Sequence, residues 1–380
     1  MSELLTRSVA KVIPKDLAEK KMKSGKKMRV YWGIDPTSSK IHLGHTVPMR
    51  KLMQFANEGH EAILIIGSFT AIIGDPSDRE GMRQPLTRED VEKNFATYKE
   101  QASKVLDFGK IQVRYNHEWL EKLKFEEILS LASNFTVQQM IERAMFEERL
   151  NKGKPVHLHE FMYPLMVGYD SVVLDVDCEL GGTDQEFNML AGRTLQAAFG
   201  KREKFVLTTP LIEGTDGRKM SKTYNNCIYL DDAPNDMFGK VMSMKDDLMK
   251  TYFECCTDVP MKEIGAILKG KPRDAKVRLA KEIVTLYHGA ASAEEAVANF
   301  DKVFVAHEVP DDIAEVKVKK GTLLIDVLVD QKLITSKSDG RRLIEQGGIK
   351  KDDTAITSAD AKAEEGVYRV GKRKFVRFIV

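Results

Sequence analysis

The chain has few cysteines: Cys178, Cys227, Cys255 and Cys256 are the four among 380 residues. They form no Cys-x-x-Cys pair, and adjacent cysteines rarely bridge each other. Neither a disulfide framework nor a cysteine-based zinc site is therefore expected. The pattern predicts a reduced, cytoplasmic protein with buried thiols.

Long apolar runs are also absent. The first five residues, Met1 to Leu5, do not form a basic segment followed by an apolar one, and no stretch of about 18 apolar residues occurs anywhere. The sequence therefore predicts no export signal, no membrane span and no membrane partner.

The chain as a whole has almost no excess of charge of either sign. With 59 Lys and Arg against 57 Asp and Glu, the net charge is only +2. The 42% hydrophobic and 31% charged content is typical of a folded globular chain, and its length predicts two or three domains. Residues 316–380 are different, because fifteen basic and nine acidic residues give them a local charge of +6. This surplus indicates a polyanionic partner.

The most informative stretch runs from Met28 to Phe55. An apolar strand ends at Ile34, a turn follows over 35–38, and a helix opens near Gly44. A strand, a loop and a helix N-terminus together present free backbone N–H groups and a positive dipole to an anion. His42 and His45 lie three residues apart at this opening, so both rings are expected on one face, where they can donate to the same phosphate oxygens.

Two simpler interpretations of these motifs remain open at this point. The pair His42-x-x-His45 resembles a metal-binding pair, although no third ligand at the spacing of a zinc protease accompanies it. Residues 218–222, which include Lys219 and Lys222, read as an ordinary solvated turn when considered alone.

Strand and helix patterns alternate in the first 225 residues. The continuous apolar run 62–67 predicts a parallel strand covered on both faces. This alternation favours a doubly wound sheet that binds ligands at the carboxyl ends of its strands, where the loop from Thr70 to Asp75 is also expected.

Helices are predicted over 1–27 and, beyond residue 226, over 234–256, 260–268 and 273–288. Four basic residues of the last helix are expected to share one side, as a charged face or an RNA-binding surface. They are Arg273, Lys276, Arg278 and Lys281.

The helix predicted over 160–173 carries Tyr163, Val167 and Asp170 on one face. An acid among apolar neighbours is costly to bury unless a donor meets it. Asp170 is therefore either solvated at a surface edge or placed to accept a hydrogen bond from a ligand hydroxyl. Further on, the Gly181-Gly182 turn lets backbone approach a ligand, and Asp184 and Gln185 can bond sugar hydroxyls.

These motifs resemble those of class I aminoacyl-tRNA synthetases. His42-Leu43-Gly44-His45 resembles their HIGH signature, and Lys219-Met220-Ser221-Lys222-Thr223 resembles their KMSKS loop, about 175 residues later. The segments around Tyr31, Asp75, Tyr163, Gly181 and Lys219 are similar, in this order, to the tyrosyl branch. Residues 336–348 resemble an S4 RNA-binding module, as found at the end of the bacterial tyrosyl enzymes, so the resemblance covers nearly the whole chain.

The resemblance implies an α/β fold: a Rossmann-like doubly wound catalytic domain, then an α-helical domain and a small α+β S4-like domain. The implied boundaries are 1–225 for the catalytic domain with a dimer-interface insertion at about 120–165, 226–305 for a helical anticodon-binding domain, 306–320 for a linker and 321–380 for the S4-like domain. The implied activity joins L-tyrosine to tRNA(Tyr), with ATP and Mg²⁺ as substrate complex, no protein-bound metal and a homodimeric assembly.

The resemblance also implies roles for individual residues. Those for catalysis at the phosphates are His42, His45, Lys219 and Lys222. Those for ATP are Asp35, Thr37, Gly44, Gly182, Asp184 and Lys222. Those for tyrosine are Tyr31 and Asp170 at the phenol, Tyr163, Asp75 and Thr70 at the ammonium group, and Val167 and Gln185. Those for tRNA are Arg341, Arg342, Lys372 and Arg373.

Val167 departs from the family, which usually has Gln there to contact the bound amino group. An altered paralogue that acts as an RNA-binding protein is therefore an alternative, although it need not keep Lys222, His42 and His45. Another nucleotidyltransferase with a His-x-Gly-His motif would not need residues 321–380. A tryptophanyl enzyme would have no use for a hydroxyl site at Tyr31 and Asp170.

Overall fold

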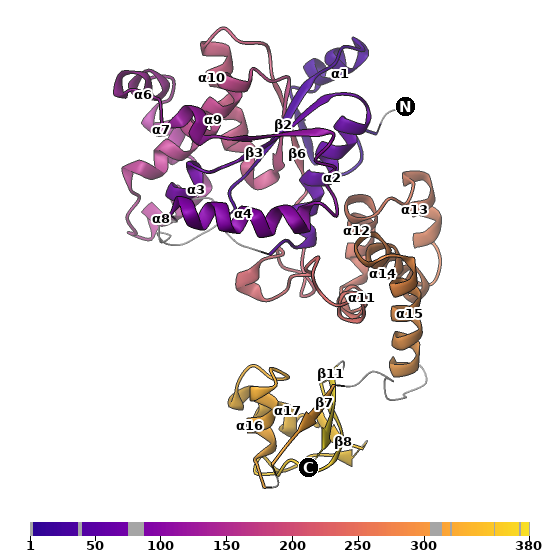
Figure 1. Ribbon diagram of the computed structural model, residues 1–380. Helices are drawn as coiled ribbons and strands as arrows, with labels where there is room; N and C mark the ends of the chain where they lie inside the picture. The colour runs from indigo at the N-terminus through magenta and orange to yellow at the C-terminus, as the bar shows by residue number, and fades with distance from the viewer. Residues whose placement is uncertain are drawn as a thin grey trace. The chain divides into compact units, whose positions relative to one another are not determined.

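The computed structural model describes residues 3–36, 40–74, 87–304, 314–319, 321–352, 354–371 and 374–379. The chain folds into two compact units, Met1–Ala290 and Ala291–Val380 (Figure 1). This division lies inside the segment 226–305 that the sequence assigns to a helical domain, so the predicted boundaries stay predictions.

Among the described residues, the first unit contains a six-stranded sheet in the order β1-β6-β5-β2-β3-β4. Its strands are β1 (Lys11–Ile13), β2 (Arg29–Ile34), β3 (Glu61–Ile66), β4 (Ile111–Tyr115), β5 (Cys178–Gly182) and β6 (Phe205–Thr209). All neighbouring pairs are parallel except β1 with β6. The predicted doubly wound parallel sheet is confirmed.

The first unit also contains helices. They are α1 (Lys15–Lys23), α2 (Leu43–Asn57), α3 (Thr70–Ile73), α4 (Arg88–Ala102), α5 (His117–Leu120), α6 (Phe125–Ala132), α7 (Val137–Ile141), α8 (Ala144–Asn151), α9 (Met162–Leu174), α10 (Glu186–Ala198), α11 (Pro234–Ser243), α12 (Met249–Cys256), α13 (Met261–Leu268) and α14 (Pro272–His288), with 3-10 helices η2 (Leu158–Phe161), η3 (Thr183–Gln185), η4 (Lys222–Tyr224) and η5 (Asp246–Leu248). No described helix is both long enough and apolar enough to cross a membrane.

The strand order explains where a ligand can bind. The chain passes from β2 through α2 to the neighbouring β3, and from β5 through α10 to β6 in the opposite direction along the sheet. Right-handed crossovers that run in opposite directions place α2 and α10 on opposite faces. The reversal between β2 and β5 leaves a crevice at the carboxyl ends of these strands.

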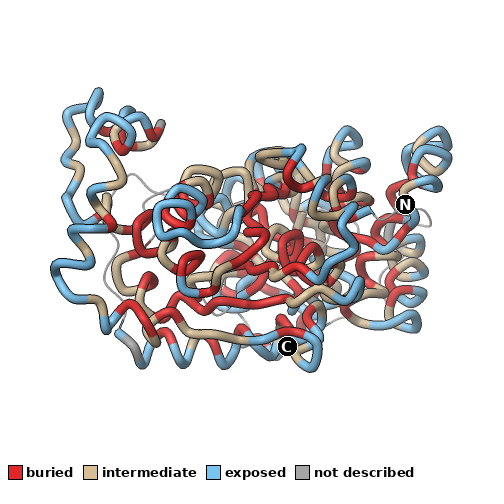
Figure 2. Tube along the Cα trace, turned by 90° about the horizontal axis from the view of Figure 1, so that it is seen from above, coloured by how far each residue is buried: buried red, intermediate tan, exposed pale blue. Residues whose placement is uncertain are grey.

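Burial follows the predicted patterns. Five of the six residues of β3 are buried, as expected for a parallel strand that is covered on both faces. Figure 2 shows the buried positions gathered along the strands and the inner sides of the helices, with the exposed positions on the outer turns.

Two helix predictions were wrong. The predicted helix over 1–27 is instead β1 followed by α1, because Pro14 separates them and β1 pairs with β6. The predicted helix over 234–256 is divided into α11 and α12 by η5.

The second unit has a core of its own, as the sequence predicts. Its described elements are α15 (Ala290–Phe304), β7 (Glu315–Lys317), α16 (Leu324–Asp330), α17 (Lys337–Glu345), β8 (Ile349–Lys351), β9 (Thr354–Ala355), β10 (Gly366–Val370) and β11 (Lys374–Ile379). The strand order is β7-β11-β10-β8-β9. Leu324, Leu328, Ile344 and Phe378 are among the buried residues that join the two short helices to the sheet. The strand β7 lies within the segment 306–320 that the sequence assigns to a linker.

Candidate functional site

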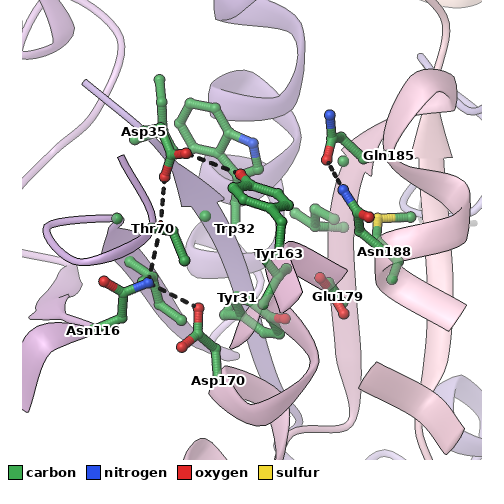
Figure 3. Close-up of a pocket in the computed structure, with 18 residues that line it drawn as sticks. Tyr31, Trp32, Asp35, Thr70, Asn116, Tyr163, Asp170, Glu179, Gln185 and Asn188 are labelled. Atoms are coloured by element: carbon green, nitrogen blue, oxygen red, sulfur yellow. Dashed lines mark hydrogen bonds between the residues drawn. The ribbon is translucent and has the colours of Figure 1, made fainter. Parts of the chain in front are cut away.

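A pocket opens at the point where the strand order reverses (Figure 3). It is lined from β2, β5, α9 and the loops that follow β2, β3 and β4. The lining residues are Tyr31, Trp32, Gly33, Ile34, Asp35, Ile65, Gly67, Thr70, Asn116, Tyr163, Val167, Asp170, Glu179, Leu180, Gly181, Gln185, Asn188 and Met189. The fold thus brings together seven of the residues that the sequence assigns to tyrosine or ATP: Tyr31, Asp35, Thr70, Tyr163, Val167, Asp170 and Gln185.

Asp170 marks one end of this pocket. It is only 3% exposed, so the interpretation of a solvated acid at a surface edge was wrong. Trp119 donates its indole N–H to Oδ1 (2.8 Å), and the Asn116 side-chain amide donates to Oδ2 (3.3 Å). Burial raises the pKa of Asp170 well above its usual value, while these two hydrogen bonds oppose the rise. The carboxylate is held in place as a buried acceptor.

Tyr31 lies at the same end, in β2, and is 1% exposed. Its hydroxyl is 2.9 Å from Oγ of Ser171, the residue that follows Asp170 in α9. Burial, followed by the charges of Glu179 and Asp170, raises the pKa of Tyr31 well above its ordinary value. The hydroxyl therefore keeps its hydrogen at any physiological pH.

A second carboxylate, Asp35, lies at the other end of the pocket as drawn in Figure 3. Its Oδ1 accepts from the Thr70 hydroxyl (2.7 Å), and its Oδ2 accepts from the Tyr163 hydroxyl (2.9 Å). Gly67 makes this arrangement possible, because a Cβ there would lie 1.8 Å from Oδ1 of Asp35 and 2.4 Å from Oγ1 of Thr70. Asp35 is thus tied to two residues that the sequence assigns to a substrate ammonium group.

Val167 lies one helical turn beyond Tyr163 on α9. It lines the pocket and packs, partly buried, against the apolar cluster that includes Tyr31, Tyr163 and Met166. This part of the wall is therefore apolar.

His42 and His45 lie at the start of α2, with His42 directly before its first residue. Their rings are stacked with centroids 3.7 Å apart, and the backbone N–H of His42 donates to Nδ1 of His45 (3.3 Å). Gly44 leaves room for this stack, because a Cβ there would lie 3.0 Å from Nδ1 of His42. Among the described residues, no three His, Cys, Asp or Glu side chains cluster to hold a metal ion.

Lys219 and Lys222 lie near the start of α2, close enough for their charges to act on His42. Burial, and then the charges of His45, Lys222 and Lys219, lower the pKa of His42 to about 2. Nζ of Lys219 donates to Oδ2 of Asp184 at 3.1 Å. The His42–His45 and Lys219–Lys222 motifs, which are distant in the sequence, therefore lie close enough to contact the same anion.

The glycine turn after β5 borders this region. A Cβ at Gly182 would lie 2.5 Å from Oδ1 of Asp184, so the turn leaves space for that carboxylate. Oε1 of Gln185 accepts from the Asn188 side-chain amide at 2.8 Å, which fixes Gln185 at the pocket edge.

Residues 22–305 match the family described as class I tRNA synthetases (W and Y). The chain belongs to this family. It is 44% identical to "Tyrosine--tRNA ligase 2" of Vibrio vulnificus (strain YJ016), over 99% of this chain and 97% of that protein. It is 46% identical to "Tyrosine--tRNA ligase" of Moorella thermoacetica, over 98% of this chain and 94% of that protein. A solved structure of a C-terminally truncated mitochondrial tyrosyl-tRNA synthetase from Coccidioides posadasii is 25% identical, with a TM-score of 0.63 over 78% of this chain and 90% of that chain.

Some predicted site residues of this class I synthetase are not part of the pocket. Thr37, Asp75, Lys372 and Arg373 lie outside the described residues. In the second unit, Arg341 and Arg342 are exposed on α17, where Arg342 pairs with Asp339 (2.7 Å).

Sequence reasoning missed several residues of the synthetase pocket. Asn116 and Trp119 hold Asp170, and Glu179 and Asn188 line the walls. Asn116 directly follows β4, so the rule that ligands bind beyond the carboxyl ends of parallel strands could have indicated it. Nothing in the local sequence marks Trp119 as the partner of an acid 51 residues later.

Proposed function

We propose that this protein is a tyrosine--tRNA ligase. It activates L-tyrosine with ATP to tyrosyl-adenylate and transfers the tyrosine to the 3′ end of tRNA(Tyr). The observation that carries the proposal is that Tyr31 and Asp170 line the same end of the pocket. The carboxylate of Asp170 is held there by two hydrogen bonds. A para-hydroxyl group can form further hydrogen bonds with both of these polar groups, and phenylalanine can form none. Tyrosyl-tRNA synthetases are the standard example of such discrimination.

The opposite end of the pocket receives the substrate's ammonium group. Tyr163 and Thr70 bond the carboxylate of Asp35 there, with Asp75 contributing as the resemblance implies. Val167 lines this pocket at a position where the family usually has an amide. Gln185 faces the acyl group from the other wall.

The nucleotide lies beyond the acyl group. His42 and His45, with the N-terminus of α2 behind Gly44, contact the triphosphate of ATP, which enters as its Mg²⁺ complex. Lys219 and Lys222 hold the phosphates that leave. The remaining contacts to ATP, at the adenosine and ribose, come from Asp35, Thr37, Gly182 and Asp184.

The chemistry requires positioning and charge stabilisation rather than a covalent intermediate. A carboxylate oxygen of tyrosine attacks the α-phosphate in line, the bond to the β-phosphate breaks, and pyrophosphate leaves. The terminal tRNA hydroxyl then attacks the acyl carbon, and AMP leaves. Donors at His42, His45, Lys219 and Lys222 stabilise the charge that develops on the phosphates.

The tRNA extends over the rest of the chain. The helical part, 226–305, reads the anticodon region. The S4-like part, 321–380, binds RNA through Arg341, Arg342, Lys372 and Arg373, and the linker 306–320 joins the two. The local charge of +6 over 316–380 suits a polyanion.

The protein acts as a cytoplasmic homodimer. Large apolar side chains are exposed on the insertion 120–165, which is mostly exposed at the left of Figure 2. They are Phe125 (74%), Leu129 (55%), Val137 (66%), Leu150 (45%) and Leu158 (71%). Several exposed large apolar side chains on one segment suit a subunit interface.

An ATP–pyrophosphate exchange assay across the twenty amino acids, followed by charging of tRNA(Tyr), tests the proposal. We expect exchange with tyrosine alone and aminoacylation of tRNA(Tyr). Exchange that depends on tryptophan, or a failure of every amino acid to support exchange, would contradict it.

A further inference from the structure

A buried polar cluster lies beneath the tyrosine pocket. It joins Lys204, Glu179 and Ser171 to Tyr31, and the side chains of Lys204 and Glu179 are 0% and 4% exposed. Nζ of Lys204 contacts Oε2 of Glu179 and donates to Oγ of Ser171 at 2.7 Å. The same nitrogen lies 5.9 Å from the centre of the Tyr31 ring. An ion pair with so little access to water is costly to bury. Lys204, Glu179 and Ser171 have no role in the chemistry described above.

The fold makes room for this cluster by means of a glycine. Gly192 lies in α10, where that helix packs against α9. A Cβ at Gly192 would lie 2.5 Å from Nζ of Lys204, 2.6 Å from Oγ of Ser171 and 3.2 Å from Oε2 of Glu179. Any larger residue there would therefore displace all three groups.

The hydrogen bonds of the cluster have a defined direction. An ammonium group has no lone pair, so Lys204 only donates, and Ser171 must accept from it. The single hydrogen of Ser171 can go to Tyr31 at 2.9 Å or to Glu179 at 3.3 Å. The shorter contact is the better hydrogen bond, and Oε2 of Glu179 is already in contact with Lys204. Ser171 therefore donates to the Tyr31 oxygen. The hydrogen of Tyr31 is then available to a second acceptor, which is either Glu179, whose hydrogen bonding contributes to the raised pKa of Tyr31, or a ligand oxygen in the pocket.

Asp170, at the same end of the pocket as Tyr31, has the opposite hydrogen-bonding role. Asp170 directly precedes Ser171 in α9, and each of its oxygens already accepts from an N–H group. Asp170 therefore acts as an acceptor toward a ligand, while Tyr31 acts as a donor.

We propose that Lys204 and Ser171 are positioning residues that set the hydrogen-bond direction at the phenol site. The chain of donors runs from Lys204 through Ser171 and Tyr31 to the substrate oxygen, and the substrate hydroxyl then donates to Asp170. This inference rests on the proposed function and deepens it. Neighbouring hydrogen bonds that point the same way polarise and strengthen each other.

Only a group that accepts one hydrogen bond and donates another completes this chain. A phenol hydroxyl does both. Phenylalanine does neither, and the para-amino group of 4-aminophenylalanine donates well but accepts poorly, since its lone pair is delocalised into the ring. The wild-type protein is therefore expected to discriminate against the amine even though the amine is nearly the same size as the hydroxyl.

Ser171→Ala tests the proposal, because it interrupts the chain and leaves the Lys204–Glu179 pair in place. Exchange kinetics are measured with tyrosine, phenylalanine and 4-aminophenylalanine. We expect the KM for tyrosine to rise about two- to tenfold, the range for loss of one neutral hydrogen bond, with the KM for ATP unchanged. The preference for tyrosine over 4-aminophenylalanine should fall by a similar factor, since Tyr31 is then free to turn and accept.

Two further variants keep the test decisive. The pair Lys204→Met with Glu179→Gln removes both buried charges together and retains Ser171, and should lower the same preference. Ser103→Ala, at the exposed end of α4, is a matched control that should leave all constants unchanged.

An unaltered preference for tyrosine over the amine in Ser171→Ala would overturn the proposal. So would an equal loss with all three amino acids together with a raised KM for ATP, because that pattern reports general damage to the fold. A wild-type protein that shows no exchange with tyrosine would instead refute the proposed function itself.

Discussion

The indole N–H of Trp119 donates to Oδ1 of Asp170 at 2.8 Å, and this contact joins a short helix after β4 to the middle of α9. Both side chains are buried, so water cannot replace the hydrogen bond if it is lost. The orientation of the acid at the phenol end therefore depends on a residue that lies outside the pocket lining.

Trp119→Phe should weaken tyrosine binding for this reason. Loss of a hydrogen bond to a charged group corresponds to about 1.5–3 kcal/mol, so we expect the KM for tyrosine to rise about ten- to a hundredfold. The same hydrogen bond lowers the pKa of Asp170, so its loss raises that pKa further and the defect should grow as the pH falls. Kinetics at several pH values, with the KM for ATP as internal control, check both expectations.

Gly67→Ala should disrupt the ammonium end of the pocket. The new Cβ would overlap Oδ1 of Asp35, and we expect about a ten- to hundredfold rise in the KM for tyrosine from overpacking of about 1–3 kcal/mol. Gly265→Ala is the matched control, because it lies in α13 with open space around it and should leave activity unchanged. Equal effects of the two variants would contradict the assignment.

Lys222→Ala should slow adenylate formation far more than it weakens tyrosine binding. Removal of one donor to developing phosphate charge typically costs on the order of 10²-fold in rate. The measurement is the pre-steady-state burst of pyrophosphate, with Lys262→Ala on the exposed surface of α13 as control. A burst rate equal to that of the wild type would remove Lys222 from the mechanism.

The low pKa of His42 predicts how stability depends on pH. His42 stays neutral in the folded protein down to about pH 2, whereas an unfolded histidine takes up a proton near its ordinary pKa of 6.5. Between these values the unfolded state binds more protons, so the free energy of unfolding falls with decreasing pH, by at most about 1.4 kcal/mol per pH unit from this group. Urea titrations from pH 7 to pH 5 should show this slope, and His42→Gln should reduce it. His60 and His288 have lowered pKa values as well and leave a residual slope in the variant.

Leu158→Lys should dissociate the proposed homodimer. A charge placed within the exposed apolar surface of the insertion cannot be buried without a partner. Sedimentation equilibrium should detect monomers for this variant and dimers for the wild type and for Phe199→Lys, a control at another exposed apolar position. A monomeric wild type at micromolar concentration would refute the predicted assembly.

Local sequence patterns were most reliable where one element determines its own structure. The apolar run 62–67 predicted β3, and the strand, turn and helix from Met28 to Phe55 predicted β2 and α2. They were less reliable where a distant residue decides the outcome. Lys276 belongs to a predicted basic face of α14, yet its Nζ is buried, paired with Asp246 and bonded to the Met244 carbonyl (2.7 Å).

The sequence by itself determined the strand–loop–helix that opens the nucleotide site, the two motifs with His42 and Lys222, and the single face shared by Tyr163 and Asp170. These features depend on the spacing of residues within one element, and that spacing is written in the chain. Only the tertiary structure decided that Trp119 bonds Asp170 and that Lys204 lies beneath Tyr31. Such pairs form because α9, α10 and the strands pack closely, and most polar groups in a packed interior are hydrogen-bonded, whatever the distance of the partner along the chain.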